Sequence, residues 1–289
     1  MLKQSFLSKI VEIILRQTKP KYMNSQEEIE SYLDNKKDEE IKTIFKTETF
    51  DSMKFVSFGE KYDDNQVILY IHGGAYVNQM NYQHTLYCYI ISKFLKKRII
   101  APVYSLAPKH HYDECYKQMI AFYNHLRCKF HKITMMGDSA GGGFILSFCQ
   151  YLNKINVKQP ENIIVFSPWL DVSMKNRYDD TNDPILGNIG LKEIGKHWAK
   201  NLETSNYLVS PFYGDNHNLP RILITAGTNE IFYPKIKEYT DKLLNDGVDA
   251  KLIVGENLFH IYPLFPIPEA YAILKEIKKE IESDRKSVG

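Results

Sequence analysis

A serine flanked by glycines carries the clearest chemical signal in the chain. The sequence GDSAG occupies residues 137–141, directly after an apolar run at 133–136 and before an apolar stretch of helical length. A nucleophile on a sharp turn from strand to helix needs small neighbours, because a Cβ atom there would collide with the adjacent strand or helix. The pattern therefore predicts that Ser139 is a nucleophile rather than part of a merely structural glycine turn.

A glycine-rich turn upstream has the composition of an oxyanion hole. Residues 72–76 read His-Gly-Gly-Ala-Tyr and follow an apolar run. Glycines let backbone N–H groups approach a developing alkoxide, so the N–H groups of Gly73, Gly74 and Ala140 are predicted to bind it. A phosphate-binding loop is the alternative, but the chain contains neither GK[ST] nor GxGxxG.

Two residues beside these motifs are expected to support them. His72 precedes the glycine turn instead of facing the nucleophile, so it is expected to hold the loop and not to serve as the base. Asp138, next to the nucleophile, is given the same supporting role.

The base and the acid follow from chain order, which in such sites is serine, acid, histidine. His260 comes after the last apolar run, whereas His217 lies earlier, in a polar loop. Glu230 is the carboxylate in the loop that follows the run at 222–225, and it would fix the tautomer of His260. Its alternative role is that of a solvated carboxylate at the start of a helix.

The elements that must position these residues alternate along the chain. Short apolar runs separated by segments of helical length are typical of a parallel sheet with helices on both faces. In such sheets ligands bind beyond the carboxyl ends of the strands, where the residues above are found. The predicted strands lie at 67–71, 99–103, 133–136, 163–166, 222–225 and 252–254.

Two segments fall outside this alternation. An amphipathic helix is predicted near the start from the spacing of Leu2, Phe6, Ile10, Ile13 and Ile14. The polar stretch 171–211 reads as an insertion with one helix, at 191–202. We expect the N-terminal helix to pack on this insertion and close an acyl pocket. The alternatives are a helix that simply packs on the protein itself and a helix on a membrane surface. The expected division is 1–40 and 171–211 as a cap, and 41–170 with 212–289 as the core.

Composition excludes several other classes of protein. The chain has 289 residues, a formal net charge of +2 with interspersed charges, 44% apolar residues and 25% charged residues. A nucleic-acid partner and a membrane-spanning segment are therefore not expected. Four cysteines without CxxC spacing indicate reduced thiols, and no signal peptide is recognised, so the expected compartment is the cytoplasm.

Together these motifs resemble the hormone-sensitive lipase family of esterases and lipases, in particular its bacterial acetylesterase-like members. The matching stretches are 72–75, 104–108, 137–142, 167–171 and 209–211. The resemblance implies an α/β-hydrolase fold with a small helical cap that hydrolyses short acyl esters, acetyl to hexanoyl, without a metal or cofactor.

The chain departs from the family pattern at four positions. Ser105 stands where the family usually has Arg, Lys109 where it has an acidic residue, and Ala75 where a third glycine is common. Glu230 takes the place of the more usual Asp. The first two departures concern a supporting loop.

Two other functions use the same residues or the same fold. An amide or formamide hydrolase of the arylformamidase type would employ an identical triad. A catalytically silent binding protein is the third reading, against which the intact GDSAG and His260 argue. The expected partner is a small-molecule acyl ester. The sequence is compatible with both a monomer and a homodimer.

Overall fold

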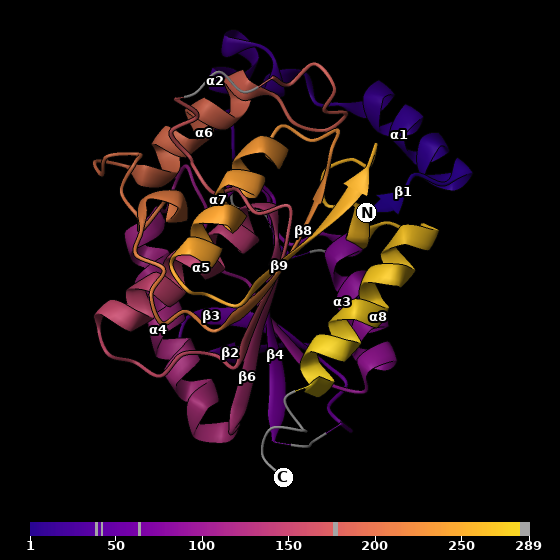
Figure 1. Cartoon of the computed structure of the whole chain (residues 1–289). Coiled ribbons are helices and arrows are strands. Elements are labelled where there is room, and N and C mark those ends of the chain that lie inside the picture. The colour runs from indigo at the N-terminus through magenta and orange to yellow at the C-terminus, as the bar shows by residue number, and fades with distance from the viewer. Residues whose placement is uncertain (38–39, 42, 63–64, 176–178, 284–289) are drawn as a thin grey trace.

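A nine-stranded sheet forms the centre of the described part of the chain (Figure 1). The computed structural model describes residues 1–289 except 38–39, 42, 63–64, 176–178 and 284–289. The strand order is β1-β9-β8-β7-β6-β4-β5-β3-β2, and β3 runs in the direction opposite to the other eight strands. The strands are β1 Leu2–Lys3, β2 Thr47–Phe50, β3 Met53–Phe58, β4 Gln66–Ile71, β5 Arg98–Pro102, β6 Lys132–Asp138, β7 Asn162–Phe166, β8 Arg221–Gly227 and β9 Ala250–Glu256.

The six predicted strands are confirmed as β4 to β9. Almost every residue of β4, β6, β7 and β8 is buried, because helices cover both faces of the sheet. In Figure 1, α3 and α8 lie on one face and α4, α5 and α7 on the other. These helices are α3 Tyr82–Leu95, α4 Tyr112–Lys129, α5 Ser139–Lys154, α7 Tyr233–Asn245 and α8 Pro268–Ser283.

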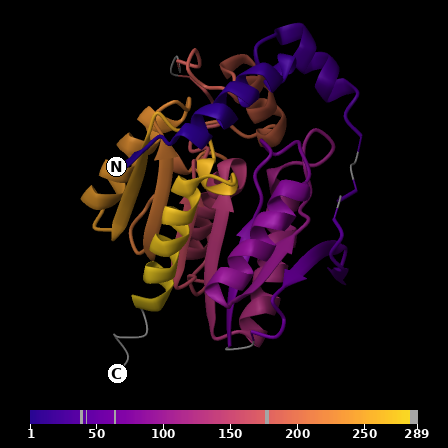
Figure 2. The same ribbon diagram turned by 90° about the vertical axis from the view of Figure 1, so that its right-hand side faces the viewer.

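Four further segments lie over the end of the sheet at which the parallel strands finish (Figure 2). They are α1 Phe6–Thr18, the 3₁₀ turn η1 Lys21–Met23, α2 Gln26–Asp34 and α6 Asn188–Ala199, called the cap helices below. Gly187 and Gly190 allow the start of α6 to approach the backbone of Met23, where a Cβ atom would collide. The helix predicted at 191–202 is confirmed as α6. Two other 3₁₀ turns, η2 Pro211–Tyr213 and η3 Tyr262–Leu264, lie in the core.

The predicted packing of the apolar residues of α1 on the insertion is wrong, although α1 does contact the insertion where Arg16 donates to the Asn182 carbonyl oxygen at 2.8 Å. Its inner face consists of Ser8, which is buried, with Val11 and Leu15 packed against the core. The apolar residues expected to pack inward point away from the protein: Phe6 is 80% exposed, and Ile10, Ile13 and Ile14 are also exposed. Helical spacing reveals that an apolar stripe exists but not which surface covers it. In this structure η1 and α2, and not the apolar face of α1, pack on α6.

Candidate active site

Ser139 stands on a sharp turn between β6 and α5. β6 ends at Asp138, α5 begins at Ser139, and the serine has a left-handed φ of +50°. Cβ atoms on Gly137 and Gly141 would collide with the carbonyl oxygen of Ile71 on the neighbouring strand β4. The physical reason given for the flanking glycines is therefore confirmed, and a non-glycine residue at positive φ stores strain at this point.

The structure brings Ser139, His260 and Glu230 together. His260 follows β9 and places Nε2 2.8 Å from Ser139 Oγ, while its Nδ1 lies 3.3 Å from Glu230 Oε2. With the Nδ1–H donating to the carboxylate, Nε2 is left to accept the serine proton. His217 is remote from this cluster and pairs with Asp215 at the surface.

All three side chains are covered by protein. Ser139 is only 6% exposed, and Glu230 and His260 are buried. Burial raises the pKa of Glu230, although the hydrogen bond and charge of His260 act in the opposite direction. The carboxylate is therefore costly to keep charged unless the imidazole beside it is protonated.

The glycine turn is tied to Asp138. The Gly73 N–H donates to Asp138 Oδ1 at 3.0 Å, so this expected oxyanion donor is engaged within the protein. Gly74 and Ala75 follow with φ of +112° and +54°. Successive N–H groups in turns can form concave anion sites, so the Ala75 N–H is a further candidate donor beside that of Gly74.

His72 is a supporting residue inside this turn. It is fully buried, its Nδ1 lies 2.6 Å from Gly73 O, and its ring stacks on Tyr104 at 4.4 Å between centroids. Burial lowers the pKa of His72 to about 3, so its ring is neutral. The hydroxyl of Tyr104 donates to His72 O at 2.7 Å.

Asp138 organises a buried polar cluster that the sequence did not reveal. Tyr70 Oη donates to Asp138 Oδ1 at 2.6 Å, and His84 Nε2 lies 3.4 Å from Oδ2. Burial by itself would raise the pKa of Asp138, but the charge and hydrogen bond of His84 and the bond from Tyr70 outweigh it and lower the pKa. The Asn81 N–H donates to His84 Nδ1 at 3.3 Å, so the N–H on Nε2 of the same ring faces the Asp138 carboxylate.

A column of buried aromatic rings runs from the cap helices to the imidazole. Trp198 of α6 stacks on Tyr76 at 4.2 Å, Tyr76 on Trp169 at 5.6 Å, and Trp169 on Phe232 at 6.0 Å. The Phe232 ring meets His260 edge to face at 5.4 Å. The column packs against the imidazole and joins it, through Tyr76 of the glycine turn, to α6.

Asp183 connects the insertion to the loop that carries Glu230. Its buried carboxylate accepts the N–H groups of Ile185 and Leu186 at 2.8 Å each and of Ile231 at 2.9 Å. An Asp followed by Pro in a polar stretch gave no signal of this role in the sequence.

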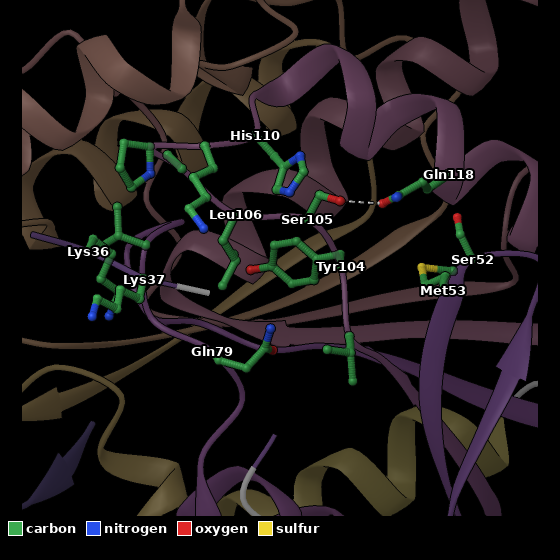
Figure 3. A pocket seen from close by; sticks show the side chains of 15 residues that line it. Lys36, Lys37, Ser52, Met53, Gln79, Tyr104, Ser105, Leu106, His110 and Gln118 are labelled. Carbon is green, nitrogen blue, oxygen red and sulfur yellow. Dashed lines mark hydrogen bonds between the residues drawn. The ribbon is translucent and has the colours of Figure 1, made fainter. Parts of the chain in front are cut away.

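A pocket of about 180 Å³ lies beside the glycine turn but is not lined by Ser139, Glu230 or His260 (Figure 3). Tyr104 and the loop after β5 form its wall, and Ser105 Oγ donates to Gln118 Oε1 at 2.9 Å. Ser105 stands where the family usually has Arg. Its hydrogen bond to Gln118 ties the loop after β5 to α4.

Neither the cysteines nor the acidic residues form a metal site among the residues described. Cys88, Cys115 and Cys149 are buried, and burial raises the pKa of each thiol.

Known proteins are similar to this chain in sequence, and solved structures are similar to it in fold. An acetyl-hydrolase of Streptomyces hygroscopicus is 23% identical over 76% of this chain and 74% of its own length. An esterase of Acinetobacter venetianus is 27% identical over 73% of each chain. The crystal structure of a putative esterase from Staphylococcus aureus superposes with a TM-score of 0.82, at 23% identity, over 93% of this chain and 98% of its own.

A solved esterase of the bacterial hormone-sensitive lipase family gives a TM-score of 0.81 at 24% identity, covering 99% of both chains. The resemblance drawn from the motifs is confirmed by these similarities. The family model described as alpha/beta hydrolase fold matches residues 68–264, which include the glycine turn, Ser139, Glu230 and His260. The chain therefore belongs to the α/β-hydrolase fold family.

Proposed function

We propose that the protein is a serine carboxylic-ester hydrolase that acts on short acyl esters through Ser139, His260 and Glu230. Relatives named esterase and acetyl-hydrolase support an esterase or lipase activity of the α/β-hydrolase type. The single observation that carries the triad is the contact of His260 with both Ser139 Oγ, at 2.8 Å, and Glu230, at 3.3 Å.

In the acylation step, Ser139 Oγ attacks the carbonyl carbon of the ester while its proton passes to His260 Nε2. The imidazolium then gives this proton to the leaving alcohol as the C–O bond breaks. Glu230, whose pKa is raised by burial, gains a charged partner at the moment His260 is protonated. The pair is therefore stabilised most in the transition state, where the stabilisation accelerates the reaction.

The negative oxygen is bound by backbone N–H groups of Gly74, Ala75 and Ala140. Ala140 lies in the first turn of α5, where N–H groups lack partners within the helix and the helix dipole favours negative charge. One such donor contributes ~3 kcal/mol in comparable sites. Water then attacks the acyl group, with His260 as base, and releases the acid.

The preference for short acyl chains rests on the packing of the insertion. The proposed cap comprises residues 1–40 and 171–211, and the proposed core comprises 41–170 and 212–289. Among the large apolar residues of the insertion, Leu186, Leu191 and Trp198 are buried in the core cluster, and Leu202 packs partly buried against it. Because these side chains already pack against protein, they contribute little lining to a long acyl tunnel.

The test is a Ser139→Ala variant assayed on aryl esters from acetyl to dodecanoyl, together with acetylated sugars and formylated amines. We expect kcat to fall on the order of 10⁴-fold or more with the fold intact, and a fluorophosphonate to label wild type but not the variant. Ser147→Ala is the matched control, because it removes another buried hydroxyl from α5 and should retain labelling and turnover. Wild-type turnover in folded Ser139→Ala would refute the triad, whereas faster cleavage of formylated amines than of esters would favour the amidase reading.

A further inference from the structure

The outer face of α1 is apolar although it faces solvent. Phe6 is 80%, Ile13 57% and Ile14 53% exposed, and Leu7 and Ile10 lie on the same side. Single exposed apolar side chains are ordinary on protein surfaces, but five on a helix of 13 residues form a continuous patch. Such a patch is costly in water unless something covers it.

An apolar groove lies on the same side of the molecule, between α3 and α8. Figure 2 shows α1 crossing above α8, with α3 beside it. Glu269, in the first turn of α8, links α8 to α1. It accepts the Ser5 N–H and the Ser8 hydroxyl and so fixes the start of α1 beside α8. The groove has a volume of about 540 Å³, and its apolar lining includes Leu86, Ile90, Leu264, Phe265, Tyr271 and Leu274.

The charges around these two surfaces are mostly positive. α3 contains no carboxylate, and Lys93 lies over the ring of Tyr89. Lys275 of α8 lies over the ring of Tyr271 at 4.5 Å, at the edge of the groove. On α1 the cations are Lys9 and Arg16, and its one carboxylate, Glu12, bonds Arg16 and the Asn229 amide.

The carboxylates of α8 do not reverse this balance. Glu269 is buried, Glu276 and Glu280 pair with Lys251, and Glu282 lies 3.9 Å from Lys278 near the end of the helix. A second copy of the chain docked through this face would bring the cations of both copies together. An anionic lipid surface offers apolar material and the opposite charge at once, and basic residues near such a surface are attracted to it.

We infer that the outer face of α1 and the α3–α8 groove together form a docking surface for an anionic lipid leaflet. The geometry corresponds to a helix lying in the interface plane with its apolar side buried in lipid. None of the described helices is long and apolar enough to cross a membrane, so the contact is peripheral. The surface adjoins the loop that carries Glu230, since Asn229 Nδ2 donates to Glu12 at 3.3 Å. Binding does not depend on the proposed catalysis.

The test measures co-sedimentation of the full-length protein with vesicles. Wild type should bind vesicles of phosphatidylglycerol and phosphatidylcholine in roughly equal amounts, and binding should weaken with added salt because part of it is electrostatic. The Ile13→Glu/Ile14→Glu double variant should bind at least about tenfold more weakly, since each isoleucine loses the free energy of transfer from water to lipid. Leu86→Glu, in the groove, provides an independent second variant.

The matched control is Ile155→Glu, which makes the same change at an exposed isoleucine on the opposite face of the sheet and should bind like wild type. Circular dichroism melts verify that each variant is folded. Equal vesicle binding by wild type and both docking-face variants would overturn the inference, as would an equal loss in Ile155→Glu. A dimer of wild type in sedimentation velocity that Ile13→Glu/Ile14→Glu dissociates would also overturn it, in favour of a second copy as the occupant.

Discussion

Replacement of Asp138 should damage the active site through the glycine turn, without touching the triad. The carboxylate accepts hydrogen bonds from Tyr70 Oη and Gly73 N and faces His84 Nε2. A buried hydrogen bond to a charged group contributes about 1.5–3 kcal/mol, so Asp138→Ala, which loses the two bonds to Oδ1, should cost roughly 3–6 kcal/mol. That is a large part of the roughly 5–15 kcal/mol that stabilises a typical domain.

Asp138→Asn is the more informative variant because it keeps one acceptor oxygen. If that oxygen stays on Tyr70 and Gly73, the new amide opposes the His84 Nε2–H, donor against donor. We expect a loss of about 1–3 kcal/mol in the free energy of unfolding. We also expect kcat to fall by about tenfold or more, because a glycine turn that shifts misplaces the oxyanion donors.

The measurement is a double-mutant cycle of Asp138→Asn with Tyr70→Phe, read by urea unfolding and by kcat. Tyr70→Phe removes one donor and leaves the Gly73 bond, so it should lower stability but affect kcat less than Asp138→Asn does. The two changes should couple by more than about 0.5 kcal/mol, since their groups share a bond. An Asp138→Asn protein with wild-type stability and kcat would refute this account of the turn.

Three other predictions concern the acid, the insertion and the substrate. Burial raises the pKa of Glu230, so the stability that its neutral form contributes is present at acidic pH and lost as the pH rises through the raised pKa. Glu230→Gln should therefore unfold at a higher temperature than wild type at neutral pH, with the gain vanishing in acid, while its kcat falls less than that of His260→Ala; a lower melting temperature at neutral pH would contradict this. Asp183→Asn should lower the free energy of unfolding by about 1–3 kcal/mol, because Asp183 accepts the Ile231 N–H. It should also move the acid limb of the kcat–pH profile to lower pH, because the charge of Asp183 adds to the burial that raises the pKa of Glu230. An unmoved profile would show that the charge of Asp183 does not act on the site. Hydrolysis should peak at acyl chains of about two to six carbons and drop steeply by about twelve, as the insertion leaves few methylene contacts of ~0.8 kcal/mol each; faster dodecanoyl than butanoyl turnover would rule out a short pocket.

The sequence predicted the core of the fold because its signals are local. Six strands could be located from apolar runs, of which β4 to β8 are almost wholly buried, and GDSAG identified the turn after β6 from sterics alone. His260 and Glu230 followed from chain order, since each comes after a parallel strand that ends at the same edge.

The predictions that failed concern the direction in which a helix face or an N–H group points, which residue spacing in the sequence does not encode. The stripe on α1 was recognised, but whether it faces protein or solvent is decided by the contacts of Ser8 and Glu269, 261 residues apart. The glycine turn was recognised too, yet the acceptor of the Gly73 N–H is set by the rotamer of Asp138. His84 and Asp183 are single polar residues in unremarkable contexts, and only the folded chain places them.

The pairing of β1 with β9 has a consequence for synthesis of the chain. Leu2 aligns with Gly255, so the strand that receives β1 emerges from the ribosome about 250 residues later. At ordinary translation rates this leaves α1 without its docking site for roughly 10–50 s. During that time the helix exposes Val11 and Leu15 as well as its outer apolar face. Nascent chains of this protein should therefore be substrates for ribosome-associated chaperones at their first helix, and release should await the last strand of the sheet.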